Sequence, residues 1–149
     1  MYTIGKISEM SGLPISTLRY YDRKGLFPDI KRTSGIRQFD ERQVEVLHII
    51  ECLKLSGLEI KDIKTFMEWC AEGSATYGKR LALFEKQKKA VESEIARLEQ
   101  VLAMIRFKCW YYEQAIADGN EDRLEKMMAE GLPSEVQALY DKGHGKIRE

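Results

Sequence analysis

The sequence predicts a mostly α-helical protein, and three observations support this fold class. Only 3 of the 149 residues are Pro, so few positions exclude a helix. Residues 77–118 contain no Pro and no Gly after Gly78, which predicts one helix of roughly 60 Å at 1.5 Å per residue. Apolar side chains recur every three or four residues along this stretch. The expected chain is therefore a small helical head, a long helix and a short helical tail.

The first 25 residues predict two short helices joined by a tight turn. Thr3 is a favourable N-cap for the first helix, and Gly12 stands where a left-handed residue ends a helix. Pro14 then turns the chain into a second helix from about Ile15 to Lys24, which Gly25 ends. This is a helix-turn-helix.

One face of the second helix gathers hydroxyl, basic and aromatic side chains. At 100° per residue this face holds Ser16, Thr17, Arg19, Tyr20, Arg23 and Lys24. Such groups contact phosphates and base edges when a helix lies in the major groove of DNA. A solvent-exposed face without a ligand is the alternative. Residues 1–37 carry seven basic and three acidic side chains, a net charge of +4 that favours an anionic partner for the head.

The segment LFPDIKRTSGIRQFD, residues 26–40, predicts a small β-hairpin. Pro28 and Gly35 favour turns, and apolar and polar residues alternate after Gly35. Lys31, Arg32 and Arg37 lie on or beside the turn. A basic hairpin directly after the two helices makes the head a winged helix-turn-helix DNA-binding domain.

The run TIGKISEMSGLPISTLRYYDRKGLF, followed by GIRQFD and LKLSGLEIKDI, resembles the DNA-binding domain of the MerR family of bacterial transcription regulators. The similarity extends from residue 2 to about residue 72. It implies that the second helix enters the major groove, that the wing contacts phosphates, and that a dimer bends and untwists a promoter palindrome. Ile36 replaces the family's usual aromatic residue before the wing arginine. The expected DNA-binding residues are Ser16, Thr17, Arg19, Tyr20, Arg23, Lys31, Arg32 and Arg37.

Two further helices are expected after the wing, from about Glu41 to Leu55 and from about Ile60 to Ala71. The first has two apolar stripes, so we expect it to pack on two sides. One stripe is Val46, Ile49, Ile50 and Leu53, and the other is Val44, His48, Cys52 and Leu55.

The long helix carries a heptad seam. Alternating steps of three and four place non-polar or amphipathic side chains at ten of eleven positions, the set being Leu81, Phe84, Lys88, Val91, Ile95, Leu98, Leu102, Ile105, Cys109, Tyr112 and Ile116. A seam this long predicts a coiled coil, and a second copy of the chain is the expected partner, giving a homodimer through residues 81–116. The family resemblance implies that the two helices run antiparallel.

The tail is expected to hold two small helices, about Glu121–Ala129 and Ser134–Lys142, separated by Pro133. The expected organisation is a winged helix-turn-helix domain at 1–74, a coiled-coil dimerisation helix at 75–118 and a short helical tail at 119–149.

Cys52 is the expected sensor thiol. His48 lies one turn earlier, and its imidazolium or the nearby Lys54 would favour a thiolate. The surrounding sequence resembles the small aldehyde- and electrophile-responsive branch of the MerR family, which has a cysteine in this helix and an FKCWYYE-like end to the long helix. The alternative is that Cys52, like Cys70 and Cys109, packs as a small apolar residue. The spacing of the three cysteines fits neither a disulfide framework nor a CxxC zinc site.

A second interpretation of the sensor rests on Trp110, Tyr111 and Tyr112, with Tyr140, Met127 and Met128 from the tail. Such a cluster binds a flat or cationic ligand. Packing of the tail onto the coiled coil is the alternative.

Other function classes lack their sequence signals. P-loop, GxGxxG, HExxH and GxSxG motifs are absent and only His48 and His144 are histidines, so we expect no enzyme, no cofactor and no metal site. No apolar run approaches the about 20 residues that span a bilayer, so we expect a cytoplasmic location. The expected partners are double-stranded promoter DNA, a second copy of the chain and RNA polymerase. A coiled-coil scaffold whose basic head binds another protein is the alternative class.

Overall fold

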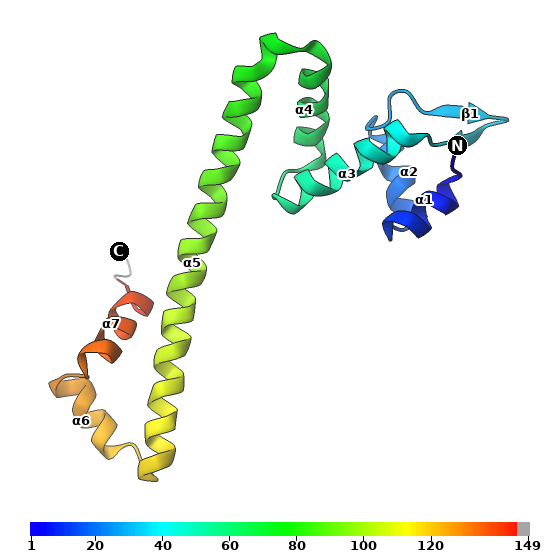
Figure 1. The fold of residues 1–149 in the computed structure, drawn as a ribbon. Helices are drawn as coiled ribbons and strands as arrows, with labels where there is room; N and C mark the ends of the chain where they lie inside the picture. The colour runs from blue at the N-terminus through cyan, green and yellow to red at the C-terminus, as the bar shows by residue number, and fades with distance from the viewer. Residues whose placement is uncertain (146–149) are drawn as a thin grey trace. The chain divides into compact units, whose positions relative to one another are not determined.

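The structure, a computed structural model, describes residues 1–145 and confirms the mostly helical fold (Figure 1). The chain divides into two compact units, Met1–Lys88 and Lys89–Glu149, and the long helix α5 (Tyr77–Asp118) belongs to both. The division into domains at 1–74, 75–118 and 119–149 stays a prediction. In the part of the chain that the structure describes, no helix is long and apolar enough to cross a membrane.

The N-terminal unit begins with the expected helix-turn-helix. In α1 (Ile4–Ser11) the hydroxyl of Thr3 accepts a hydrogen bond from the backbone N–H of Lys6, and Gly12 ends the helix with a φ of 73°. The second helix, α2, spans Ile15–Arg23. The cap and the left-handed glycine therefore set the bounds of α1 as the sequence predicts.

The wing is an antiparallel hairpin of β1 (Lys31–Thr33) and β2 (Ile36–Gln38). Its two turn residues, Ser34 and Gly35, have φ values of 51° and 78°, the conformation of a tight two-residue hairpin turn. The backbone of Phe39, just after β2, exchanges two hydrogen bonds with Tyr2, which ties the wing to the start of the chain.

Two helices and a short turn complete this unit. Asp40 and Gln43 form a capping box at the start of α3 (Glu41–Leu55), and α4 (Ile60–Glu72) leads through the 3-10 turn η1 (Ser74–Thr76) into α5. The core of the unit is made by buried apolar side chains from α1 to α4 and the loops between them, namely Ile7, Leu18, Tyr21, Leu26, Phe27, Phe39, Leu47, Ile50, Leu58 and Ile63.

The expectation that α3 packs on two sides is wrong within one chain. Ile50 is buried, but Leu55 is 89% exposed, and His48, Cys52 and Ile49 are also exposed. The cause is geometric, because the core of the unit covers only one face of α3. Val44 of the second stripe packs against the core, whereas His48, Cys52 and Leu55 are left at the surface of the described chain.

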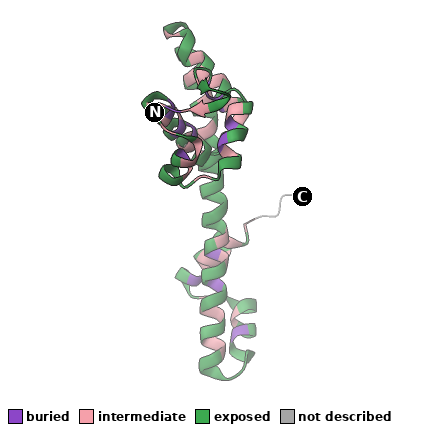
Figure 2. Cartoon of the chain, turned by 90° about the vertical axis from the view of Figure 1, so that its right-hand side faces the viewer, coloured by how far each residue is buried: buried purple, intermediate pink, exposed green. Residues whose placement is uncertain are grey.

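The C-terminal unit packs α6 (Asp122–Glu130) and α7 (Ser134–Gly143) beside the second half of α5. Its buried apolar side chains are Ala103, Phe107, Leu124 and Val136. Gly143 approaches α5 so closely that a Cβ there would lie 2.5 Å from the backbone nitrogen of Met104. Residues 89–100 of α5 are all exposed, and Figure 2 shows this stretch in green.

Candidate nucleic-acid interface

The face of α2 that the sequence singles out lies at the surface. Leu18 and Tyr21 on the opposite face are buried in the core, which turns the polar face outward. Lys24 places its Nζ 5.6 Å from the centroid of the Tyr20 ring. Of the expected DNA-binding residues on this helix, Thr17 is half-buried, and Ser16, Arg19, Tyr20 and Arg23 are exposed.

A single carboxylate fixes the wing to α2. Asp22, whose side chain is 8% exposed, accepts a hydrogen bond from Nε of Arg37 at 2.6 Å and from a terminal nitrogen of Arg32 at 2.7 Å. Arg37 stands directly opposite Arg32 in the hairpin register. One negative charge therefore holds two wing arginines beside the helix, and the cluster keeps a net positive charge.

The consecutive residues of the RYYD run thus have different roles. Arg19 and Tyr20 face outward, Tyr21 packs in the core, and Asp22 binds the wing. The sequence analysis predicted a role for Arg19 and Tyr20 and none for Tyr21 and Asp22. An acidic residue at the edge of a basic face was the available signal for Asp22.

Tyr21 also connects α2 to α3. Its hydroxyl donates to Oε1 of Glu51 at 2.8 Å and accepts from Nζ of Lys54 at 2.7 Å. Burial is the main cause that raises the pKa of the Tyr21 phenol, and the hydrogen bond to Tyr21 raises the pKa of Lys54. The phenol therefore stays protonated and the amine charged at neutral pH.

A hollow of about 570 Å³ lies beside Tyr20 in the N-terminal unit. Leu58 and Ile60 line it, and four lysines that the sequence analysis did not single out as a group surround it, namely Lys24, Lys54, Lys61 and Lys64. Lys61 lies 3.7 Å from Glu59 and Lys64 lies 4.0 Å from Glu68, both as exposed ion pairs. The basic surface of the head therefore continues from α2 past the end of α3 to α4.

Comparisons with known proteins place this architecture in a family. A profile described as MerR HTH family regulatory protein matches residues 2–69. An uncharacterized HTH-type transcriptional regulator of Haemophilus influenzae is 39% identical over 120 residues, 80% of this chain and 89% of the relative. The crystal structure of HiNmlR, a MerR family regulator lacking the sensor domain and bound to promoter DNA, is 39% identical with a TM-score of 0.64, covering 80% of this chain and 95% of that chain. The chain belongs to the MerR family of transcriptional regulators.

A second solved structure has the same fold. A MerR family transcriptional regulator from Bacillus thuringiensis is 41% identical with a TM-score of 0.58, covering 72% of this chain and 96% of that chain. The winged helix-turn-helix and the long helix predicted from sequence are therefore confirmed. MerR-family proteins are transcription regulators and not enzymes, as expected.

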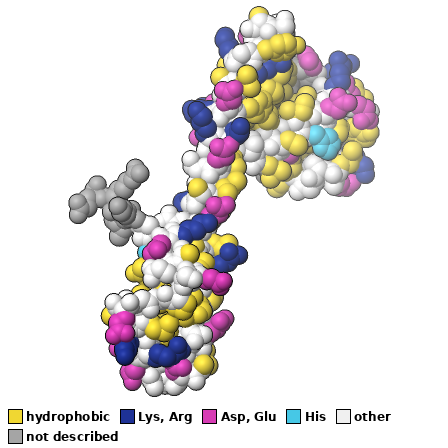
Figure 3. All heavy atoms as spheres, turned by 60° about the vertical axis from the view of Figure 1, so that its left-hand side comes forward, with side chains coloured by type: hydrophobic (Ala, Val, Ile, Leu, Met, Phe, Trp, Pro, Cys, Tyr) yellow, Lys and Arg dark blue, Asp and Glu magenta, His cyan; other side chains and the backbone are white. Residues whose placement is uncertain are grey.

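The heptad seam of α5 is exposed along the described chain. Its apolar members Leu81, Phe84, Val91, Ile95, Leu98, Leu102, Ile105, Tyr112 and Ile116 all retain substantial solvent exposure. Apolar stripes of this length are rarely left exposed on a monomer. Figure 3 shows hydrophobic side chains, in yellow, at the surface of the chain.

All three cysteines are free and exposed. The alternative that Cys52 and Cys70 pack as buried apolar residues is therefore wrong within one chain, and Cys109 lies exposed on the seam of α5. Cys52 and His48 are both exposed on the second stripe of α3. Among the described residues, no group of three His, Cys, Asp or Glu side chains is arranged to hold a metal ion.

The aromatic cluster of the tail centres on a residue that the sequence analysis did not name. Phe107 is buried, and ring centroids of Trp110, Tyr111 and Tyr140 lie 6.2, 6.2 and 5.1 Å from its own. His144 stacks on Tyr140 at 4.0 Å. The spacing of apolar residues at every third or fourth position along α5 was the signal that could have identified Phe107. The residues of α7 join this aromatic cluster through the tertiary fold, which residue spacing does not reveal.

Proposed function

We propose that this MerR-family regulator binds a promoter palindrome as a homodimer, with α2 in the major groove and the wing on the flanking phosphates. The observation that carries the proposal is the Asp22 contact, which holds Arg32 and Arg37 of the wing beside the outward face of α2. The similarity to HiNmlR, whose structure contains promoter DNA, supports the same ligand.

Each part of the surface has a role that follows from its chemistry. The hydroxyl, guanidinium and phenol groups of Ser16, Thr17, Arg19, Tyr20 and Arg23 contact bases and phosphates in the groove. The positively charged side chains of Lys31, Arg32 and Arg37 contact the phosphate backbone of the DNA. Arg37 carries five N–H donors and gives one to Asp22, so its contact with Asp22 is compatible with a phosphate contact.

The lysines around the hollow beside Tyr20 extend the backbone-binding surface. Ammonium groups on exposed side chains bind phosphates as point charges. Lys54 is anchored by Tyr21, which orders this cation before DNA arrives. We expect the phosphate backbone of the DNA to pass over Lys54, Lys61 and Lys64.

The second copy binds along the seam of α5, residues 81–116. Burial of the exposed apolar side chains of the seam supplies the driving force. The dimer then bends and untwists the promoter for RNA polymerase, as the family resemblance implies, and it does so in the bacterial cytoplasm.

Cys52 is the proposed sensor thiol for a reactive aldehyde or another electrophile. The sulfur bonds to the carbonyl carbon of the aldehyde, and the carbonyl oxygen takes up the thiol proton, giving a hemithioacetal. Exposure of Cys52 supports its access to such reagents. An adduct on α3 changes the exposed stripe that also holds His48 and Leu55, and a difference of a few kcal/mol between two conformations is enough to switch them.

Cysteine variants test this sensor. Cys52→Ser should keep folding, dimerisation and DNA binding but lose the transcriptional response to aldehydes, whereas Cys70→Ser, which replaces another exposed thiol, should keep the response. Mass spectrometry after mild aldehyde treatment provides the direct readout. Labelling of Cys70 or Cys109 with Cys52 unmodified would remove Cys52 as the sensor.

Salt-dependent DNA binding tests the proposed function itself. An operator is first obtained by in vitro selection from random duplexes with the wild-type chain, and its affinity is then measured by fluorescence anisotropy. If a dimer neutralises about six to ten phosphates, log K should fall with log salt with a slope of about −5 to −9. A chain that neither enriches a sequence nor binds duplex DNA in a salt-sensitive way is better described as a coiled-coil scaffold.

A further inference from the structure

The C-terminal unit contains a pocket whose composition differs from that of the DNA-binding surface. Its volume is about 310 Å³, and residues of α5, α6, α7 and the turns beside them line it. This volume is near the lower end of about 300–1,000 Å³ for small-molecule sites, which suits a ligand with one ring. The pocket lies wholly within the C-terminal unit.

Aromatic rings make most of the wall. Tyr140 meets Phe107 edge to face at 5.1 Å, and Tyr111 meets Tyr112, which also belongs to the seam of α5, edge to face at 5.2 Å. The His144 ring stands nearly perpendicular to Phe107 at 5.8 Å. Rings held in several orientations present both faces and edges to a bound molecule, and aromatic faces attract cations.

A carboxylate lies at the same pocket. Glu121 accepts a hydrogen bond from the Tyr111 hydroxyl at 2.8 Å. This bond, followed by burial and by the charges of Glu121 and Glu125, raises the pKa of Tyr111 to about 12. The hydrogen bond places the negative charge of Glu121 beside the Tyr111 hydroxyl, and a negative charge at the pocket favours a positively charged ligand.

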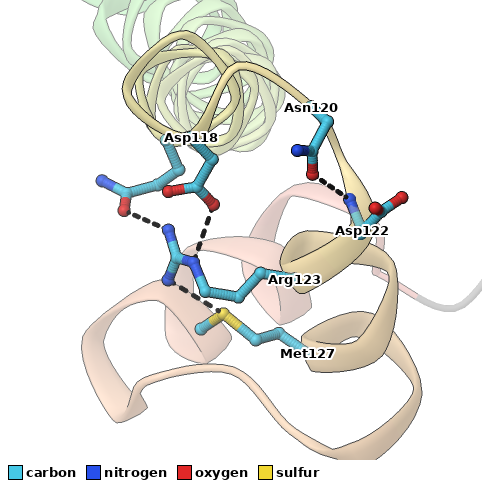
Figure 4. Close-up of polar contacts among 6 residues, drawn as sticks. Asp118, Asn120, Asp122, Arg123 and Met127 are labelled. Carbon is cyan, nitrogen blue, oxygen red and sulfur yellow. Dashed lines mark hydrogen bonds and ion pairs between the residues drawn. The ribbon is translucent and has the colours of Figure 1, made fainter.

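The turn that carries Glu121 is held in place by its neighbours. Figure 4 shows Arg123 of α6 donating to Asp118 at the end of α5 and to the sulfur of Met127, and Asn120 accepting from the backbone N–H of Asp122. The Arg123–Asp118 distance is 2.8 Å. These contacts fix Glu121 relative to the rings before any ligand binds.

One positively charged side chain already lies beside the aromatic rings of this pocket. Nζ of Lys108 lies 5.9 Å from the centroid of Phe107. Lys108 also lines the pocket, so it is an internal competitor for a cationic ligand. Its replacement by a neutral residue is expected to have the opposite effect to the replacement of Glu121.

We propose that this pocket binds a small organic cation, a substituted ammonium group attached to an aromatic ring. The ring packs among the tyrosines, and the ammonium group lies between an aromatic face and Glu121. The proposal concerns ligand binding by the C-terminal unit and does not depend on the DNA-binding function, so the two can fail separately.

The test uses the full chain with methionines labelled at the 13C-methyl group and benzyltrimethylammonium as the probe. Met128 lines the pocket, whereas Met10 and Met67 lie in the N-terminal unit and serve as internal controls. Phenylpropanoate and benzyl alcohol test the preference for a cation. We expect a saturable shift of the Met128 methyl signal with the cation, with Met10 and Met67 unchanged.

Variants of opposite sign make the test specific. Glu121→Gln keeps an acceptor for Tyr111 and should weaken binding of the cation by about three- to tenfold, whereas Lys108→Gln should strengthen it. Glu113→Gln removes an exposed carboxylate of α5 outside the pocket and should change little. Tyr111→Leu, with folding checked by circular dichroism, should weaken binding through loss of the ring.

Three results would overturn the proposal. They are equal binding of the anion and the cation, absence of a saturable shift at Met128, and the same affinity for the Glu121→Gln and Glu113→Gln variants.

Discussion

Replacing Asp22 with Asn tests whether the wing must be held by α2 for specific recognition. The change removes the charge to which Arg37 and Arg32 donate at 2.6 and 2.7 Å. Arg37 is 21% exposed, and a hydrogen bond to a charged group contributes about 1.5–3 kcal/mol. Arg32 is 45% exposed, so solvent screening limits its ion pair to about 0–1 kcal/mol. Because Asn keeps one acceptor, we expect a net loss of about 2 kcal/mol.

This energy affects both stability and DNA binding. A loss of about 2 kcal/mol lowers the melting temperature of a chain of this size by about 4–8 °C. If the released wing must be reordered on the operator, the binding free energy of each head becomes less favourable by the same amount. This corresponds to a loss of affinity of about 30-fold for each head. The variant also loses a negative charge, which strengthens attraction to any DNA. Asp22→Asn should therefore bind the operator more weakly and random DNA equally or more tightly.

Fluorescence anisotropy with the selected operator and with a scrambled duplex measures both affinities at the same salt concentration. Asp29→Asn is the matched control, because Asp29 is exposed and the change in charge is the same. A positioning role for Asp22 would be refuted by two results together. The Asp22→Asn variant would bind the operator with an affinity equal to or higher than that of Asp29→Asn, and its melting temperature would be unchanged.

Three further predictions follow from the same structure. Leu98→Asp puts a charge on the exposed seam and should dissociate or unfold the dimer, and a stable wild-type monomer in analytical ultracentrifugation would contradict the seam as the interface. Arg37→Ala should weaken operator and random DNA together and reduce the salt slope, so an unchanged slope would argue against a phosphate contact. The pKa of Tyr111 is raised to about 12 from 10.0, so its contribution to stability is present below pH 10 and is lost as pH rises through 12. Ultraviolet titration should show this phenol ionising at lower pH in Glu121→Gln.

Local rules predicted the helices because they act within a few residues. The Thr3 cap and the left-handed Gly12 start and end α1 through contacts at short range along the chain. The 3–4 spacing of apolar residues likewise predicted α5, whose observed bounds are Tyr77 and Asp118.

Contacts between distant residues were not predictable in the same way. Asp22 binds residues ten and fifteen positions away, and Tyr21 binds Glu51 thirty positions away, so both pairings depend on how the helices pack. Apolar periodicity also predicted a second packed side for α3, but it cannot say which stripe the core covers, and Leu55 is exposed. The spacing of apolar residues shows that one face of a helix is apolar, but only the tertiary fold determines which residues cover that face.

Native mass spectrometry of the protein bound to its selected operator tests the central proposal most directly. Two chains bound through α2 and the wing to inverted half-sites give one dimer per palindrome. We expect a selected sequence with two-fold symmetry, a complex of two chains with one duplex, and strongly reduced binding when one half-site is scrambled. A non-palindromic sequence bound by a single chain, with no effect of the second half-site, would contradict the proposal.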